Sequence, residues 1–146
     1  MKNKGFTLVE LLVVIVIIVL ISTIGYAGIT AAQQKIRENL WQGQIDAIES
    51  AAQLYGEDNK NRLTGVCNIG SENITNCLTI HVQDLIDENY LRTDEVDEEG
   101  RKVIINESLD ENDANYYANN LEVFVYMDEV SEVVYAKLNY VENLES

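Results

Sequence analysis

Residues 4–29 read KGFTLVELLVVIVIIVLISTIGYAGI, and no other segment constrains the architecture as strongly. Between Phe6 and Ile29 the only charged residue is Glu10, and residues 11–21 are apolar without a break. A helix rising ~1.5 Å per residue over this span is roughly 36 Å long, enough to cross a hydrocarbon core of about 30 Å. We therefore expect a transmembrane helix over residues 6–29.

The charges on either side of this run are distributed unevenly. Lys2 and Lys4 precede it, and a positive flank stays on the cytoplasmic side, so the rest of the chain should be extracytoplasmic. The chain has 10 basic and 25 acidic side chains, a formal charge of −15. Residues 1–63 hold six of each, so residues 64–146 carry the whole acidic excess. We expect no nucleic-acid partner, because phosphate binding requires a positive surface.

Two simpler interpretations of the apolar run are a secretory signal cleaved near Ala31 and Ala32, and an ordinary membrane anchor. A secretory signal has an apolar region of about 7–15 residues, whereas this run is longer and contains a carboxylate. An ordinary anchor does not explain Glu10, because a carboxylate at the bilayer centre costs about 2.5–3.5 kcal/mol. Since no base lies within the span, the partner of Glu10 is expected from another chain or from a newly formed amino terminus.

The N-terminal run Lys4-Gly5-Phe6-Thr7-Leu8-Val9-Glu10-Leu11-Leu12 resembles the type III signal sequence of type IV prepilins and of the pseudopilins of type II secretion and competence systems. The resemblance implies that a prepilin peptidase removes the leader, residues 1–5, between Gly5 and Phe6. It implies that the same enzyme methylates the new Phe6 amine. It also implies that the Glu10 carboxylate pairs with the Phe6 amine of a neighbouring subunit during assembly.

Beyond the transmembrane segment the apolar residues thin to a stripe with helical spacing, namely Ile36, Leu40, Trp41, Ile45, Ile48, Ala52 and Tyr55. Since no proline interrupts residues 6–59, we expect residues 30–60 to continue the first helix as an amphipathic spine. Trp41 and its neighbours are expected to pack under a sheet and not to bind a ligand. Residues 61–146 would then form an acidic, extracytoplasmic head.

The head carries two runs of alternating apolar residues, 121–127 and 134–140, which a short polar segment separates. This pattern predicts a β-hairpin, and a β-branched run at 101–105 suggests a third strand. Apolar spacing between Thr79 and Leu91 suggests a short helix. We expect an α+β fold in which a long N-terminal helix packs against a small antiparallel sheet, in agreement with the pilin-like head that the resemblance implies.

Cys67 and Cys77 have nine residues between them, and in an extracytoplasmic domain two cysteines favour a disulfide. On the chain-entropy model it would stabilise the head by ~3 kcal/mol. A metal site that adds His81 is the alternative, but three candidate ligands without a closely spaced cysteine pair are a weak signal.

Two acidic clusters, residues 94–99 and 110–113, are rich in the oxygen ligands that Ca²⁺ prefers. Neither cluster has the spacing of a known calcium loop, so solvated surface is the favoured interpretation and we expect no resident cofactor.

No catalytic motif is found and the only histidine is His81, so we do not expect an enzyme. The resemblance implies a type IV pilin-like structural subunit, held in the inner or cytoplasmic membrane as a precursor and polymerised into a cell-surface pilus for adhesion or motility. Its partners would be the prepilin peptidase and methyltransferase, the pilus assembly machinery and other pilin subunits. The alternatives are a pseudopilin of a type II secretion or competence system, and an unassembled membrane-anchored binding domain.

Overall fold

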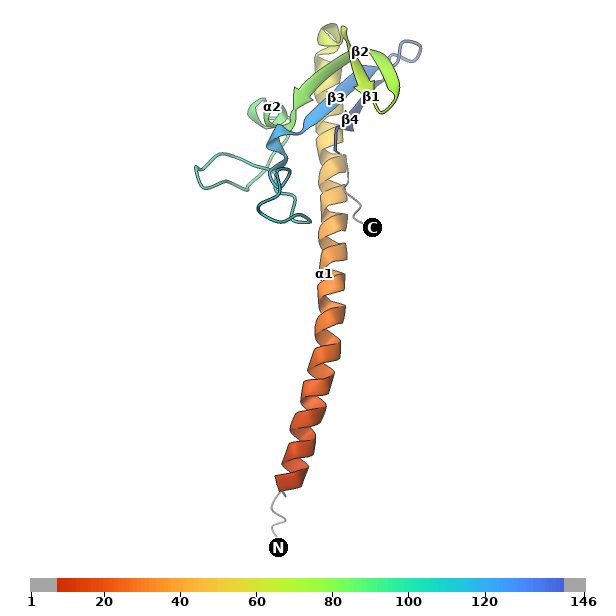
Figure 1. Cartoon of the computed structure of the whole chain (residues 1–146). Coiled ribbons are helices and arrows are strands. Elements are labelled where there is room, and N and C mark those ends of the chain that lie inside the picture. The colour runs from red at the N-terminus through yellow and green to blue at the C-terminus, as the bar shows by residue number, and fades with distance from the viewer. Residues whose placement is uncertain (1–7, 141–146) are drawn as a thin grey trace, which may run out of the picture. The chain divides into compact units, whose positions relative to one another are not determined.

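The structure is a computed structural model that describes residues 8–140, with side chains except those of residues 22–29 and 31. Contacts divide the chain into two units, residues 1–38 and residues 39–146, and each is described by itself. The helix α1, Leu8–Asp58, contributes to both units. Its bounds agree with the prediction of one helix from the apolar run into the amphipathic stripe (Figure 1).

The first unit is helical throughout its described part and exposes its apolar side chains. Along residues 8–21 the large apolar side chains are between 42% and 80% exposed. Helix formation here needs no packing partner within the chain, because the run contains neither proline nor glycine and satisfies its backbone hydrogen bonds internally.

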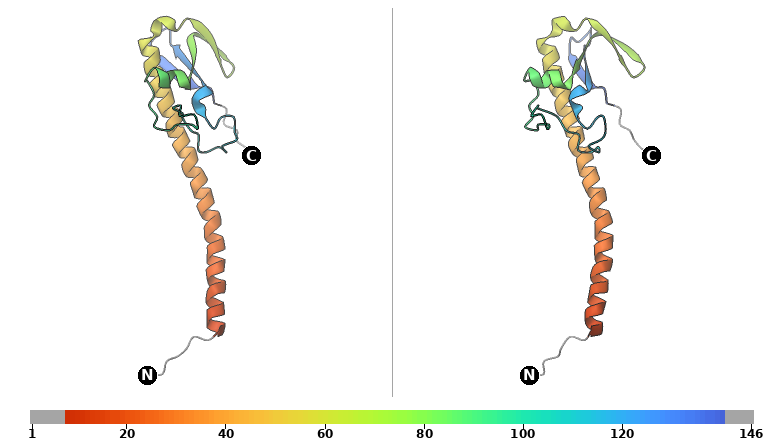
Figure 2. Two further views of the ribbon diagram at one scale, coloured as in Figure 1. Left: turned by 90° about the vertical axis from the view of Figure 1, so that its left-hand side faces the viewer. Right: turned by 60° about the vertical axis from the view of Figure 1, so that its left-hand side comes forward.

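The second unit contains a four-stranded antiparallel sheet in the order β1-β2-β3-β4. Its strands are β1 (Gly65–Ile69), β2 (Glu72–His81), β3 (Glu122–Met127) and β4 (Val134–Leu138). The last turns of α1 lie against one face of this sheet (Figure 1, Figure 2). The predicted α+β arrangement of a helix on an antiparallel sheet is therefore confirmed.

The predicted hairpin is β3 and β4. Val125 pairs with Ala136 in the register of these strands, and Tyr126 pairs with Tyr135. Because successive side chains of a strand point to opposite faces, Val123 and Val125 are fully buried on the helix side, while Tyr126 and Tyr135 lie on the other.

The predicted strand at residues 101–105 is wrong. Within the described residues this segment makes isolated bridges, Val96 with Lys102 and Ile105 with Tyr117, and no strand. The Ile104 N–H donates to Oδ1 of Asn119 over 2.9 Å, and the Ile104 carbonyl accepts from the N–H of Ala118. Val103 and Ile104 are buried in the head, and the backbone of Ile104 forms its hydrogen bonds with the turn at residues 118–119. These bonds take the place of those to a neighbouring strand.

The two strands β1 and β2 are not anticipated by the sequence pattern. Strand β2 contains two Asn and two Thr, and it buries only Cys77 and Ile80 among its ten residues, while β1 buries only Cys67. Pairing with β3 and the bond between the cysteines hold them in the sheet, and neither leaves an alternating apolar signature.

The short helix α2, Val82–Asp87, is confirmed but shorter than predicted. At its start, the Asp84 carboxylate accepts the N–H of His81 over 2.8 Å. At its end, Asn89 adopts a left-handed conformation with φ of 64°, and the N–H groups of Tyr90 and Leu91 both donate to the carbonyl of Leu85. Residues 79–81, which the pattern assigns to this helix, belong to β2.

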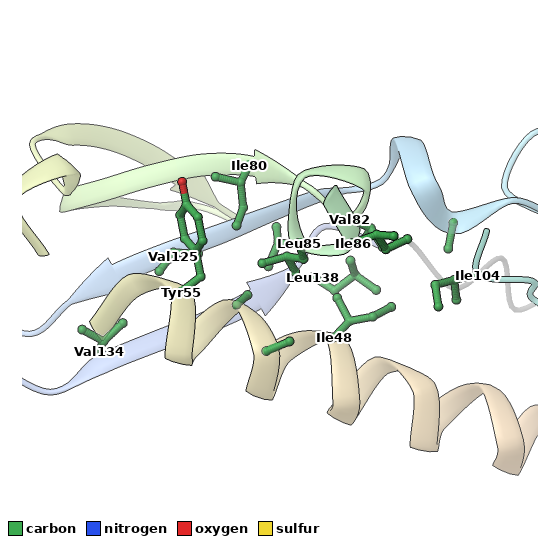
Figure 3. Close-up of a cluster of buried hydrophobic side chains, with 14 of the residues drawn as sticks. Ile48, Tyr55, Ile80, Val82, Leu85, Ile86, Ile104, Val125, Val134 and Leu138 are labelled. Atoms are coloured by element: carbon green, nitrogen blue, oxygen red, sulfur yellow. The ribbon is translucent and has the colours of Figure 1, made fainter. Parts of the chain in front are cut away.

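The core lies between α1, the sheet and α2, and Figure 3 shows Ile48 and Tyr55 of α1 among Val125, Leu138 and Leu85. Trp41 is 3% exposed and meets the ring of Tyr140 edge-on at 5.4 Å, which agrees with its predicted packing role.

The part of the amphipathic stripe that the sheet covers begins at Trp41. From the apolar stripe one could expect the sheet to cover Ile36 to Tyr55, but Leu40 is 58% exposed and Ile36 is 57% exposed. The six residues of β3 extend about 20 Å, which matches only about 13 residues of helix. A sheet of this size therefore covers the helix over little more than residues 41–56.

The closest approach between helix and sheet is at Gly56. A Cβ atom at this position would collide with Cγ1 of Val125 and lie 2.7 Å from Cγ1 of Val134. We expect Gly56→Ala to lower the free energy of unfolding by about 1–3 kcal/mol, because helix and sheet must move apart. Denaturant unfolding of the full chain in detergent micelles, followed by Trp41 fluorescence, measures this.

The matched control is Gly43→Ala on the same helix. A Cβ there has no atom within 4 Å, so the change should raise stability by up to about 1 kcal/mol through helix propensity alone. Equal stability of the two variants would contradict the assigned close approach.

Candidate functional site

The N-terminal segment is the candidate site, and the structure describes part of it. Gly5 and Phe6, the predicted cleavage and methylation residues, lie outside the described residues. Glu10 lies in the first turn of α1 with an exposed side chain. A carboxylate at this end of a helix is favoured by the helix dipole and by the N–H groups of the first turn.

The apolar surface of α1 next to Glu10 is continuous. Described side chains from Leu11 to Ile21 are between 42% and 65% exposed on every side of the helix. Monomeric proteins rarely expose so large an apolar surface to water. The segment therefore needs apolar surroundings, either lipid or the same surface on another helix.

The predicted transmembrane helix, residues 6–29, lies partly outside the described part of the chain. Residues 6 and 7 and the side chains of residues 22–29 are not among those described. Among the helices that the structure does describe, none combines the length and the apolar character needed to cross a membrane. The membrane span stays a prediction.

The predicted disulfide is present between Cys67 of β1 and Cys77 of β2, with the Cα atoms 5.7 Å apart. Both residues are buried, at 5% and 1% exposure. The bond joins the edge strand to the rest of the sheet and closes a short loop, which favours the folded state by ~3 kcal/mol on the chain-entropy model.

The alternative metal site of Cys67, Cys77 and His81 is wrong, because both sulfurs are consumed by the disulfide. His81 instead lies at the start of α2, where its side chain is 53% exposed and Nδ1 lies 3.7 Å from Oδ2 of Asp84.

The acidic cluster at residues 94–99 is organised around Arg101. The Asp97 side chain is 6% exposed, and its carboxylate accepts the Arg101 N–H over 2.8 Å and the Arg101 Nε–H over 2.7 Å. The Arg101 Nη2 also donates to Glu99 over 2.7 Å. These carboxylates are used to fold the loop.

The second acidic cluster, residues 110–113, forms local turns. Oδ1 of Asp110 accepts the N–H of Asn112 over 3.0 Å, and Oδ1 of Asp113 accepts the N–H of Asn115 over 2.8 Å. In the part of the chain that the structure describes, no three His, Cys, Asp or Glu side chains are grouped to hold a metal ion.

The sequence patterns do not single out a pair of tyrosines on the sheet of the head. Tyr126 and Tyr135 stack on the outer face of the sheet, beside Asp128 and Glu129 of the β3–β4 turn. The alternation of the two strands places both tyrosines on the face opposite the core. Only the register of the hairpin makes them direct neighbours.

Comparison with known proteins bears on the N-terminal segment. Residues 1–26 match the family described as the prokaryotic N-terminal methylation motif, the signal motif of type IV pilins and prepilins. The matched range contains Gly5, Phe6 and Glu10, and it confirms the resemblance of this segment. No curated protein and no solved structure matches the chain.

The motif supports a precursor of the type IV pilin or pseudopilin kind. The motif implies a membrane-anchored precursor that a prepilin peptidase processes and that assembles with other pilins, and it suggests a structural subunit. It covers 26 of the 146 residues and makes no statement about the head.

The acidic turns predict a loss of stability in acid. Burial acts to raise the pKa of Asp97, but hydrogen bonds from the N–H and guanidinium of Arg101 outweigh it and hold that pKa below its ordinary value of 3.8. The N–H of Asn112 lowers the pKa of Asp110, and the N–H of Ser131 lowers that of Asp128. Each carboxyl therefore takes up a proton more readily in the unfolded chain.

This stabilisation is complete above pH about 5 and is lost as the pH falls through the folded-state pKa values. We expect the melting temperature of the full chain in micelles to fall between pH 5 and pH 2.5, and Asp97→Asn to flatten the curve. Circular dichroism at a series of pH values measures both. Glu111→Gln, which removes an exposed carboxyl of the other cluster, is the control. An Asp97→Asn curve parallel to that of the unmodified chain would contradict the role of Asp97.

Proposed function

We propose that this chain is a type IV pilin-like subunit that is cleaved after Gly5, methylated at Phe6 and polymerised through its apolar helix into a cell-surface filament. The observation that carries the proposal is the methylation motif over residues 1–26. The exposed apolar side chains of residues 8–21 support it, because packing against the same surface of other subunits removes them from water.

Glu10 has a specific role in this proposal. Inside a bundle of apolar helices a carboxylate is costly unless a positive group pairs with it. The methylated amine of Phe6 on a neighbouring subunit is such a group, and cleavage after Gly5 creates it. A subunit that enters out of register leaves both charges unpaired, so the pair selects one axial offset between neighbours.

The head would determine the chemistry of the filament surface. Residues 64–146 carry 19 acidic and 4 basic side chains, so a filament that displays many heads is strongly acidic. Repulsion between heads is screened beyond about 8 Å at physiological ionic strength. A surface of this kind attracts cations and basic partners.

A pseudopilin of a type II secretion or competence system is the second candidate, because the same motif supports it. Electron microscopy with an antibody to the head separates the two. Long labelled fibres support a pilin, and short fibres that stay within the cell envelope support a pseudopilin.

The mature N-terminus tests the processing step. We expect mass spectrometry of the chain purified from its own cells to find N-methylated Phe6 as the first residue. An unprocessed Met1, or cleavage near Ala32, would overturn the proposal.

Removal of the Glu10 carboxylate tests assembly. We expect Glu10→Ala to be cleaved normally but to give filament yields more than tenfold lower, because loss of one partner of a buried pair costs about 3–5 kcal/mol. The measurement is the ratio of sheared filament to membrane-bound subunit. Glu38→Ala, an exposed acid on the same helix, is the control and should leave the ratio unchanged. A normal yield from Glu10→Ala would refute the pairing role.

A further inference from the structure

An open hollow of about 520 Å³ lies at the β3–β4 turn, next to β2. Its lining includes Tyr126, Tyr135 and Ile74, together with the acidic residues Asp128 and Glu129. We call it the tyrosine hollow. Among the described residues that line it, none is basic.

The two tyrosines form an aromatic surface at this hollow. Tyr126 and Tyr135 pair across β3 and β4, with ring centroids 5.6 Å apart and ring planes inclined by 25°. Tyr135 is 44% exposed, although its neighbour Val134 is fully buried. The face of an aromatic ring carries partial negative charge and attracts cations, so this pair favours a positively charged group above it.

The acidic wall of the hollow is fixed by hydrogen bonds across the sheet. Oε1 of Glu129 accepts the hydroxyl of Thr75 over 3.1 Å and Nδ2 of Asn76 over 3.2 Å. These bonds fasten the β3–β4 turn to β2. The second oxygen of the carboxylate, Oε2, takes part in neither bond.

The turn itself is held in the same way. Oδ1 of Asp128 accepts the N–H groups of Val130 and Ser131 over 3.1 and 2.7 Å and the Ser131 hydroxyl over 2.8 Å. At the far end of the turn, Nζ of Lys60 donates to the carbonyl of Glu132 over 3.2 Å. Because these residues are already ordered, binding a ligand does not cost the conformational entropy of ordering them.

Charge around the hollow also favours a cation. Of the bases at the turn and on β4, Lys60 lies 2.8 Å from Oε2 of Glu57 and Lys137 lies 3.5 Å from Oε1 of Glu49, so each is paired with a glutamate. The acidic excess of residues 64–146 adds to the field of Asp128 and Glu129. Anions are therefore repelled and cations are attracted to this site.

We propose that the tyrosine hollow binds an arginine side chain on the surface of a partner protein. A guanidinium stacks on a tyrosine face and donates charge-assisted hydrogen bonds to a carboxylate, so it uses the rings together with Oε2 of Glu129, the oxygen outside the bonds to Thr75 and Asn76. A lysine has a compact charge and uses them less well. The binding does not require a filament, but if the proposed function holds, many copies along one fibre raise the avidity for a partner with several arginines.

The test uses the full chain in detergent micelles with ¹³C-labelled tyrosine rings, observed by NMR. The probes are the blocked tripeptide acetyl-Gly-Arg-Gly-amide and the same peptide with citrulline, the neutral isostere of arginine. We expect the arginine peptide to shift the Tyr126 and Tyr135 signals saturably with a dissociation constant of a few millimolar, and the citrulline peptide to bind about tenfold more weakly. Equal shifts from both peptides, or none from either, would overturn the proposal.

Matched variants locate the site. Tyr135→Leu keeps an apolar side chain and Glu129→Gln keeps an oxygen that accepts hydrogen bonds, so both should retain the fold while weakening arginine binding about fivefold. Tyr117→Leu, at a tyrosine of similar exposure outside the hollow, should not change it. The Val125 methyl signals report whether each variant keeps its core. Unchanged affinity in both hollow variants with the core intact would contradict the assignment.

A sugar is the main rival for a hollow with aromatic and acidic walls. Galactose, titrated in the same way, is expected to leave the two tyrosine signals in place. If galactose shifts them and the arginine peptide does not, the hollow is a carbohydrate site and the proposal is wrong. Either result leaves the processing and assembly of the subunit untouched, because those depend on residues 1–26.

Discussion

The close packing of the last turns of α1 against the sheet is the contact on which the head depends. It is possible because Gly56 lets the helix backbone approach Val125 and Val134, and because Ile48 and Tyr55 on the preceding turns fill the core. The sheet buries one face in this contact, while its other face stays open. Core contacts beyond the sheet, such as those of Leu85 in α2 and Ile104 in the loop that follows it, build on the same helix surface. A head of this size has one core, so a change in the spacing between helix and sheet affects every element attached to it.

The two parts of α1 meet the same physical requirement in different ways. From Trp41 onward most of its apolar stripe is buried within the chain, and of the intervening polar residues Glu49 accepts the N–H of Leu138 in β4. From Leu8 to Ile21 its apolar residues surround the helix and find no cover within the described chain. A sheet that packs against one face of a helix covers an apolar stripe on that face, but it does not cover a helix that is apolar on all sides. The N-terminal part is therefore suited to an environment that is apolar on all sides, as lipid or a bundle of apolar helices is.

Local periodicity was enough to predict some elements and not others. The helix and the β3–β4 hairpin follow from spacings of apolar residues, and the disulfide follows from two cysteines in a domain that the sequence predicts to be extracytoplasmic. The strands β1 and β2 are held by pairing with β3 and by the bond from Cys67 to Cys77, so their polar sequences carry no such signal. The run at 101–105 has the composition of a strand, but its partner for hydrogen bonds is a turn with Asn119. The tyrosine hollow depends on the contact of Glu129 with Thr75, 54 residues away, which no local pattern records.

Some of the acidic residues of the head are used to make its turns. The chain has no proline and eight glycines, so it has few residues that set turn geometry by their backbone alone. Asp97, Asp110 and Asp128 do this with their side chains, each accepting N–H groups two to four residues ahead. Hydrogen bonds to the backbone fix the position of such a carboxylate, so its negative charge stays at one place on the surface. In the loops at 97 and 110 the fixed charge faces Arg101 or an asparagine of its own turn. The carboxylate of Asp128 instead lies beside the stacked rings of Tyr126 and Tyr135. These surroundings, and not the number of acidic residues, make the β3–β4 turn suited to binding a cation.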